Sequence, residues 1–240
     1  MKLIQAEWYR MLHGRYRWGI TIALVIVSYW LVHQEHMQYF SGEQILQTLL
    51  MNPISVMWSG VIVAAECVGS NYESRNWNGA IYLGYGRTKM VLMKAVVYYL
   101  WVTLIQNSSL LIVITRYQAW DRLFELDGKV LLASWGVHLL CCVAIWTVPF
   151  TLAYVCRNLF LGMAISGGIA FLCQTLIGDA TGNKLAEWIQ KGYPAGRMVS
   201  YEWCGNFEMA KAGELLCLCG GYLVIGLGVA VVVFRKQELK

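Results

Sequence analysis

The chain has 240 residues, of which 58% are hydrophobic and only 14% carry a charge. Because soluble domains carry about 25% charged residues, a soluble fold of this composition would lack the residues to cover its surface. The composition therefore excludes a soluble protein and predicts a polytopic membrane protein. The net charge of +5 does not indicate nucleic-acid binding, because Lys and Arg gather at the ends of apolar runs.

Residues 1–17 predict an amphipathic helix that lies in the membrane interface. At 100° per residue, the apolar and the basic side chains fall on opposite faces: Ile4, Trp8, Met11 and Leu12 against Lys2, Arg10, His13 and Arg17. The helix is expected to end where Gly14 is followed by Arg15. No small-residue cleavage site follows, so a secretory signal is not expected. A soluble amphipathic helix is the alternative, which attachment to a membrane span disfavours.

Six apolar runs predict an all-α fold with six membrane-spanning helices, at 18–32, 53–68, 90–115, 130–156, 159–177 and 212–234. The first run is shorter than the roughly 20 residues that a hydrocarbon core requires. Asn52 and Pro53 are suited to begin the second helix, as its N-cap and first residue. Pro149 is expected to kink the fourth helix. Gly162 and Gly168 allow close helix packing in the fifth.

The segments between the predicted spans differ in charge. Residues 116–129 place Trp120 and Phe124 among acidic residues and predict a short helix on the outer interface. Residues 178–211 mix Pro, Gly and charges, and predict an outer segment with partly embedded turns. Of the 19 Lys and Arg residues, 12 lie in 1–17, 69–94, the turn at Arg157 and the tail after Phe234. Because positive flanks resist translocation, both termini are expected in the cytoplasm.

The cysteines and histidines form no clear catalytic or metal-binding pattern. Seven of eight cysteines fall in or at the edges of spans and only Cys204 lies clearly outside, so no disulfide framework is expected. His33 and His36, with Glu35, would suit a metal at the outer end of the first span, but interfacial histidines without a ligand are far commoner. No phosphate-binding loop and no His-Glu-x-x-His occur. We expect no metal, no cofactor and no enzymatic activity in this chain; ATP, if used, must bind another chain.

Four consecutive polar residues, Gln106, Asn107, Ser108 and Ser109, stand in the middle of the third predicted span. They cover every side of a helix, so protein or a cavity must shield them from lipid. They either line a translocation path or join helices through hydrogen bonds, and the sequence leaves both open. Glu214, at the outer start of the sixth span, is a candidate gate or an interfacial anchor. The predicted spans contain few charged residues, and a path with so little charge suits apolar or amphipathic cargo better than ions.

The polar segment 69–89, between the second and third predicted spans, combines charge with large apolar side chains. Ser74 or Asn76 can cap a helix of about two turns, and Gly84 can end it. This composition suits docking of a soluble partner at the membrane face, and a solvated connector is the ordinary alternative. The candidate contact residues are Glu73, Arg75, Trp77, Ile81, Tyr82, Leu83, Gly84, Arg87 and Lys89.

Certain residues of this segment form a recognisable motif. They are, in order, Asn71, Tyr72, Glu73, then Gly79, Ala80, Ile81, then Gly84, Arg87, Thr88, Lys89 and Lys94. This order resembles the first cytoplasmic loop of ABC-2 type transporter permeases, with Arg75 standing where the family more often has Gly. The layout is similar as well, with an amphipathic N-terminus, six spans and a short basic tail.

The resemblance implies a single transmembrane domain over 1–240, which forms half of a dimeric permease in the bacterial plasma membrane. A second copy or a paralogue would complete the permease. Two copies of a cytoplasmic ABC ATPase would dock on the loop and bind ATP and Mg. The resemblance implies export, and the small size and amphipathic interior favour amphipathic or hydrophobic peptides of the bacteriocin or cytolytic type. Immunity by expulsion of antimicrobial peptides or drugs is the alternative within transport. A membrane enzyme and a non-transporting scaffold are the alternatives from other classes.

Overall fold

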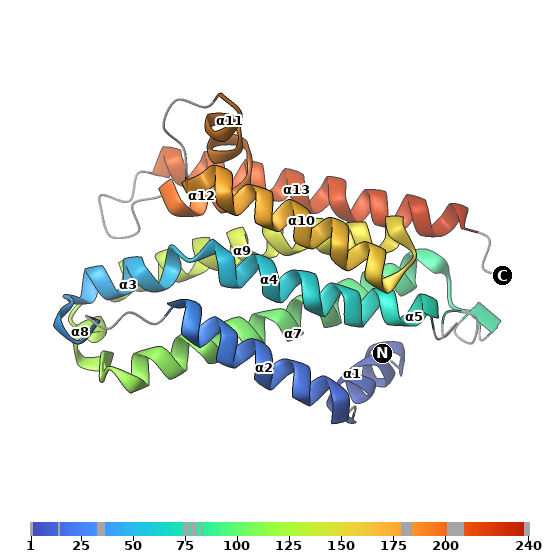
Figure 1. Cartoon of the computed structure of the whole chain (residues 1–240), viewed down its shortest axis with the longest axis horizontal. Coiled ribbons are helices and arrows are strands. Elements are labelled where there is room, and N and C mark those ends of the chain that lie inside the picture. Colours follow the sequence, from blue (N-terminus) through green and yellow to red (C-terminus); the bar gives the residue numbers. More distant parts are fainter. Residues whose placement is uncertain are drawn as a thin grey trace.

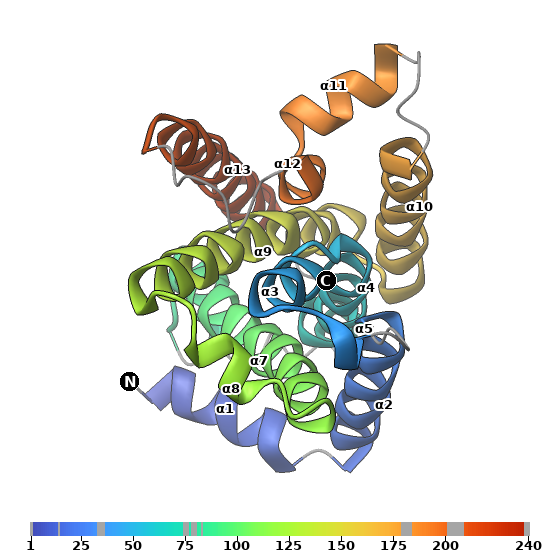
Figure 2. The ribbon, with the colours of Figure 1, turned by 90° about the vertical axis from the view of Figure 1, so that its left-hand side faces the viewer.

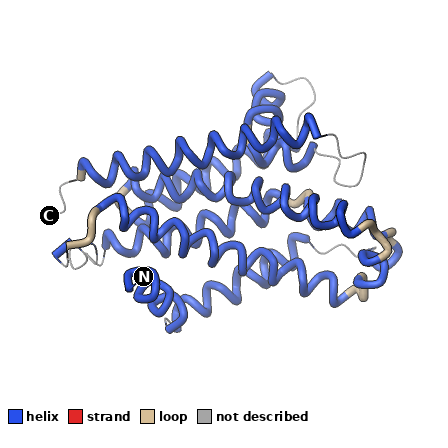
Figure 3. The backbone as a smooth tube through the Cα atoms, turned by 180° about the vertical axis from the view of Figure 1, so that it is seen from behind, coloured by secondary structure: helices blue, strands red, loops and turns tan. Residues whose placement is uncertain are grey.

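The computed structural model describes residues 2–13, 15–32, 37–73, 77, 81–82, 84–178, 184–200 and 209–237. These residues form helices joined by short connections and contain no strand (Figures 1 and 3). The long helices lie side by side along one axis of the molecule (Figure 1). Helices satisfy their backbone hydrogen bonds internally, which a membrane requires of any segment that crosses it.

Five helical stretches are long and apolar enough to cross a membrane: Gly42–Tyr72, Arg87–Arg116, Gly128–Cys156, Leu159–Ile177 and Gly213–Lys236. The prediction of an all-helical, multi-pass membrane fold is therefore confirmed. The predicted first span, 18–32, forms helix α2 (Arg15–Val32), but its apolar part, Arg17–Trp30, is shorter than the other five stretches. A sixth crossing, and the side on which the termini lie, stay predictions.

The predicted second span, 53–68, is part of a longer helical stretch. A short 3-10 helix, η1 (Met37–Tyr39), leads into α3 (Gly42–Leu50). A capping box formed by Ser41 and Gln44 stabilises the start of α3. Helix α4 (Pro53–Ala64) continues the stretch, and the Asn52 side chain accepts from the Ser55 N–H at 3.3 Å, as predicted for its N-cap. A π-helical turn, η2 (Ala65–Gly69), and α5 (Ser70–Glu73) complete it. Residues 42–50, which lie between the first two predicted spans, therefore extend the second one.

The remaining helices follow the predicted order. They are α7 (Arg87–Arg116), α8 (Trp120–Phe124), α9 (Gly128–Cys156), α10 (Leu159–Gly178), α11 (Lys184–Gly192), α12 (Pro194–Ser200) and α13 (Met209–Lys236). Helix α8 is the short helix expected within 116–129. Arg157, at φ 56°, ends α9 in the left-handed conformation and turns the chain into α10. The segment 178–211, expected to consist of turns, includes two helices, α11 and α12.

Helix α9 lies at the centre of the core, against α4, α10 and α13. Its Trp146 is fully buried and donates from Nε1 to the Val56 carbonyl oxygen on α4 at 2.8 Å. The Tyr98 hydroxyl on α7 donates to the carbonyl oxygens of Gly60 and Trp146, each at 3.0 Å. A Cβ at Gly60 would stand 2.5 Å from Cδ1 of Trp146, so α4 and α9 approach closely only because that residue is glycine.

Helix α1 (Lys2–His13) lies across the bundle beside α7 (Figure 2). It ends at His13, as the break in its pattern predicted. Met11 is buried, and the Trp8 ring packs edge-on against Trp101, with ring centroids 5.7 Å apart. Part of the face that was expected to rest on lipid is therefore covered by protein, while Leu12 on the same face is 36% exposed.

Candidate functional site

The loop after α5 lies at the end of the molecule where the start of α1 and the end of α13 also lie (Figure 1). Of the nine predicted contact residues, the structure describes six: Trp77, Ile81, Tyr82, Gly84, Arg87 and Lys89. Arg75, Leu83 and the side chain of Glu73 lie outside the described residues. The six described residues range from the buried Trp77 to the exposed Tyr82.

Trp77 is an anchor, since its side chain is only 3% exposed. Its ring packs against Phe234 of α13 and Tyr154 of α9, with ring centroids 4.7 and 5.9 Å apart, and against Tyr72 at 5.7 Å. Its indole N–H has no hydrogen-bond partner among the described residues, so ring packing holds it in place. The expectation that Trp77 faces a partner is therefore wrong, because the aromatic side chains of α9 and α13 provide an apolar environment for its ring.

Tyr82 has 90% of its side chain accessible, while Ile81 is half-buried against the core. Gly84 follows at φ 80°, and its N–H donates to the Ile81 carbonyl oxygen at 2.9 Å. Gly84 therefore stops the helical turn, as predicted. Lys89 is also exposed, with Nζ 6.0 Å from the centroid of the Tyr85 ring. Tyr82 and Lys89 are the described loop residues best placed to meet a partner.

Arg87 joins the loop to the end of the last helix. Its guanidinium donates to the Arg235 carbonyl oxygen at 2.8 Å and also to that of Gln237. The last carbonyl groups of a helix lack partners within the helix, so Arg87 caps α13. The Gln237 side chain accepts from the Tyr72 hydroxyl at 2.8 Å and donates to the Tyr154 carbonyl oxygen at 3.1 Å. Both sides of the loop are thus bonded to the end of α13.

Two ion pairs tie the N-terminal helices to the same end of the bundle. Lys94 Nζ lies 2.7 Å from Glu7 Oε2, with side chains 6% and 19% exposed, and also lies 5.0 Å from the Trp77 ring centroid. Arg17 Nε lies 2.6 Å from Glu66 Oε1, which joins α2 to η2. In the sequence, Lys94 and Glu66 are recognisable only as charges near the ends of predicted spans. Their partners are far away in the chain, so spacing gave no signal for the pairs.

We expect Glu7→Gln to lower the free energy of unfolding by about 1–3 kcal/mol, because it leaves the buried Lys94 ammonium without a charged partner. Thermal unfolding of the purified protein measures the change. Glu187→Gln, at an exposed position on α11, is the matched control and should have little effect. The double variant Glu7→Gln/Lys94→Met should recover part of the loss. Equal stability of Glu7→Gln and the parent would contradict a structural role for this pair.

The four polar residues of α7 make contacts that favour helix packing. Gln106 Nε2 donates to Ser55 Oγ on α4 at 3.1 Å, and Asn107 Oδ1 accepts from the Trp135 indole of α9 at 3.0 Å. The hydroxyls of Ser108 and Ser109 instead donate to carbonyl oxygens of α7 itself, each at 2.7 Å. Gln106 and Asn107 therefore join α7 to its neighbours, while a role of the four residues in a path stays a prediction.

Leucine substitutions distinguish these two roles. Asn107→Leu should lower the free energy of unfolding by about 1 kcal/mol, since it leaves the Trp135 donor without its acceptor. Ser108→Leu breaks only a bond within α7 and should stay within about 0.5 kcal/mol of the parent. If the cluster serves packing alone, Ser108→Leu also leaves cargo-stimulated ATP hydrolysis by a partner ATPase unchanged. A changed stimulation at parental stability would instead place Ser108 in the path.

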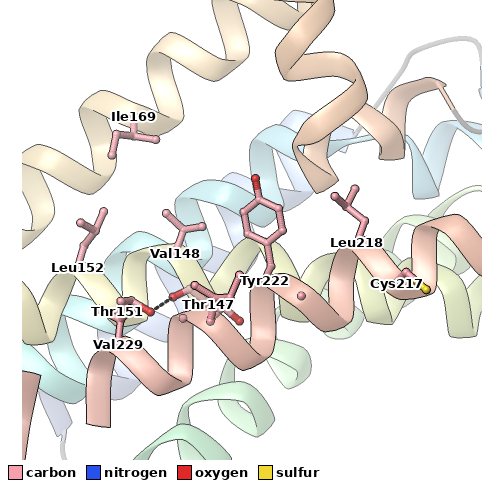
Figure 4. Close-up of a pocket in the computed structure, with 12 residues that line it drawn as sticks. Thr147, Val148, Thr151, Leu152, Ile169, Cys217, Leu218, Tyr222 and Val229 are labelled. Carbon is pink, nitrogen blue, oxygen red and sulfur yellow. Dashed lines mark hydrogen bonds between the residues drawn. The ribbon is translucent and has the colours of Figure 1, made fainter. Parts of the chain in front are cut away.

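A pocket of about 510 Å³ lies between α9, α10 and α13, away from the polar cluster of α7. Its lining is almost wholly apolar, and Figure 4 shows Leu152 and Val148 of α9, Ile169 of α10 and Leu218 of α13 around it. The polar atoms nearby are already bonded. The Tyr222 hydroxyl donates to the Gly192 carbonyl oxygen at 3.0 Å, and the hydroxyls of Thr147 and Thr151 bond to protein atoms.

Glu214, the candidate gate, stands near the beginning of α13. Its carboxylate lies 3.8 Å from the Arg197 guanidinium of α12, and the side chains of Glu214 and Arg197 are 72% and 41% exposed. The pair is thus open to solvent or headgroups, and the gate stays a prediction. Among the described residues, no three His, Cys, Asp or Glu side chains gather as a metal site. His33, Glu35 and His36 lie outside those residues, as does Cys204.

The fold and this site define the class of the protein: an all-helical, multi-pass membrane protein whose loop at one end is bonded to the end of its last helix. No protein-family model matches the chain, and comparison with curated proteins finds no match either.

Proposed function

We propose that the chain is the membrane subunit of an ATP-driven exporter of the ABC-2 permease kind. It works with a second permease copy or a paralogue and with two copies of a cytoplasmic ABC ATPase, which bind ATP and Mg. The proposal rests on the loop sequence, which resembles the corresponding loop of that family, and on the way this loop is anchored. Its setting would be a bacterial plasma membrane.

The observation that carries the proposal is an exposed aromatic side chain between two residues that are fixed to the bundle. Tyr82 is 90% exposed, while Trp77 before it is buried and Arg87 after it caps α13. Other aromatic rings, such as those of Tyr39 and Trp188, are also exposed. Tyr82 differs from them because it stands in the segment that resembles a coupling loop, and aromatic side chains are typical anchors of protein interfaces. A partner bound at Tyr82 would therefore hold a segment that is fixed to the bundle on both sides.

The anchors give the loop a means to pass force into the membrane helices. Closure of the ATPases on ATP would displace the loop. Trp77 would carry this displacement to Tyr154 of α9 and Phe234 of α13, and Arg87 to the end of α13. Lys94, which contacts both Trp77 and Glu7, would bring α1 along. In this mechanism α1, α9 and α13 move together with the loop.

The cargo would be an amphipathic or hydrophobic peptide of the bacteriocin or cytolytic type. The three ion pairs of the described N-terminal half, Lys94–Glu7, Arg10–Glu7 and Arg17–Glu66, lie at the loop end rather than in the middle of the spans. A path with little charge does not favour small ions. Expulsion of an external antimicrobial peptide would use the same apparatus in the same direction.

Co-purification tests the class. A Walker-type ATPase encoded beside this chain should co-purify with it. In vesicles, the rate of ATP hydrolysis by this ATPase should rise when a cytolytic peptide is supplied on the ATPase side. Loss of peptide from the ATPase side with time would demonstrate export. An ATPase that neither binds the chain nor responds to it would contradict the proposal and favour a membrane scaffold.

A further inference from the structure

The pocket between α9, α10 and α13 has the dimensions of a hydrocarbon chain. Its lining residues on α13 run from Cys217 to Val229, which is about 18 Å along a helix. A volume of about 510 Å³ over this length gives a mean cross-section of about 28 Å². A chain of carbon atoms in contact about 4 Å apart needs about 16 Å². The pocket is therefore long and wide enough for a single hydrocarbon chain.

Apolar side chains line the pocket, and the hydroxyl hydrogens of Tyr222, Thr147 and Thr151 are already donated to protein oxygens. Tyr222, whose hydroxyl is bonded to the Gly192 carbonyl oxygen, stands between the pocket and the α11–α12 segment (Figure 4). Its ring also packs edge-on against Tyr193, with centroids 5.9 Å apart. A ligand in the pocket must therefore be apolar along its length, and any polar group it carries must lie beyond the pocket.

A pair of opposite charges stands at one end of the pocket. Glu214 lies four residues before Leu218 on α13, so the two side chains occupy the same face, one turn apart. Arg197 of α12 lies 3.8 Å from the Glu214 carboxylate. A ligand whose chain ends near Leu218 would therefore meet one cation and one anion together.

We propose that this pocket binds one acyl chain of a zwitterionic membrane phospholipid. The Arg197 guanidinium contacts its phosphate and the Glu214 carboxylate contacts its ammonium group. An anionic lipid would have the phosphate but no ammonium group, and Glu214 would repel its net negative charge. The lipid fills the space between α10 and α13, two helices whose outer faces carry large exposed apolar residues such as Phe171 and Val224. The inference does not depend on transport.

Two glycines of α13 provide a matched test of the pocket. A Cβ at Gly221 or at Gly228 would meet nothing within 4 Å, so neither position resists a larger side chain. Gly221 lines the pocket and Gly228 does not. Gly221→Leu should therefore occupy part of the pocket and block a chain that runs along it, while Gly228→Leu adds the same atoms to the same helix elsewhere.

The full chain is extracted from vesicles of phosphatidylethanolamine and phosphatidylglycerol. Native mass spectrometry then measures the mass of the protein together with the lipid that it retains. The parent and Gly228→Leu should retain phosphatidylethanolamine, and Gly221→Leu should lose it while its thermal unfolding stays cooperative. Glu214→Gln should lower the ratio of retained phosphatidylethanolamine to phosphatidylglycerol roughly two- to fivefold, as expected for a solvent-accessible charge contact. Equal retention by Gly221→Leu and the parent would refute the pocket as the site. Equal retention of both lipids by the parent would refute the headgroup contacts.

Discussion

Replacing Trp77 by alanine should lower the free energy of unfolding by about 3–5 kcal/mol, the usual cost of removing a large buried aromatic side chain. The ring packs against Tyr154, Phe234 and Tyr72, which belong to three separate helices, and all of these contacts would be lost together. The Lys94 ammonium would also lose the ring that stands 5.0 Å away. Thermal or denaturant unfolding of the purified protein measures the change.

Trp188 provides the control for this substitution, since it is 80% exposed on α11. Trp188→Ala should change the free energy of unfolding by no more than about 0.5 kcal/mol. Trp77→Phe keeps a ring in place and should retain most of the stability. If Trp77→Ala were as stable as Trp188→Ala, Trp77 would not be a buried anchor and force could not pass through it to α9 and α13.

The second large effect is expected on binding of the partner ATPase. Tyr82→Ala should weaken the affinity of the ATPase for the permease at least about tenfold, because truncation of an aromatic anchor at the centre of an interface costs about 2 kcal/mol or more. The stability of the permease should stay unchanged, since Tyr82 is 90% exposed and contributes little to the core. Titration of the purified ATPase against the permease in lipid discs measures the affinity.

Tyr39 is the matched control for Tyr82. It is 78% exposed and lies in η1, at the end of the molecule opposite the loop. Tyr39→Ala removes an equally exposed aromatic ring and should leave the ATPase affinity unchanged. Should both variants bind the ATPase as the parent does, the loop would be a connector, and the resemblance to the coupling loops of permeases would have no functional meaning.

Much of the fold could be predicted from the sequence, because membrane spans are set by long apolar runs and helix ends by local chemistry. Asn52 and Pro53 begin α4 as their types require, and Gly84 ends a turn with positive φ. The extension of the second span by α3 was missed. Residues 42–50 are amphipathic, with Glu43 and Gln47 among apolar residues, and this pattern is typical of a connector outside the membrane. In the fold, tertiary packing covers their apolar side.

The candidate site was less predictable, because its contacts join residues far apart in the chain. The position of Tyr82 and the role of Gly84 follow from local pattern. Whether Trp77 faces solvent or the core depends on Phe234, which is more than 150 residues away in the chain. No spacing rule connects the two. Arg87 is a further example, since its partners are carbonyl groups of the last helix rather than side chains.

The most direct measurement of coupling is photocrosslinking from Tyr82 in the intact membrane. A photoreactive phenylalanine analogue at this position, in cells that also produce the neighbouring Walker-type ATPase, should yield a crosslink to that ATPase that changes in yield when ATP is trapped. The same analogue at Tyr39 should yield none. Crosslinks from Tyr82 to lipid alone, or to the ATPase with equal yield from Tyr39, would contradict the assignment of this loop as the docking site.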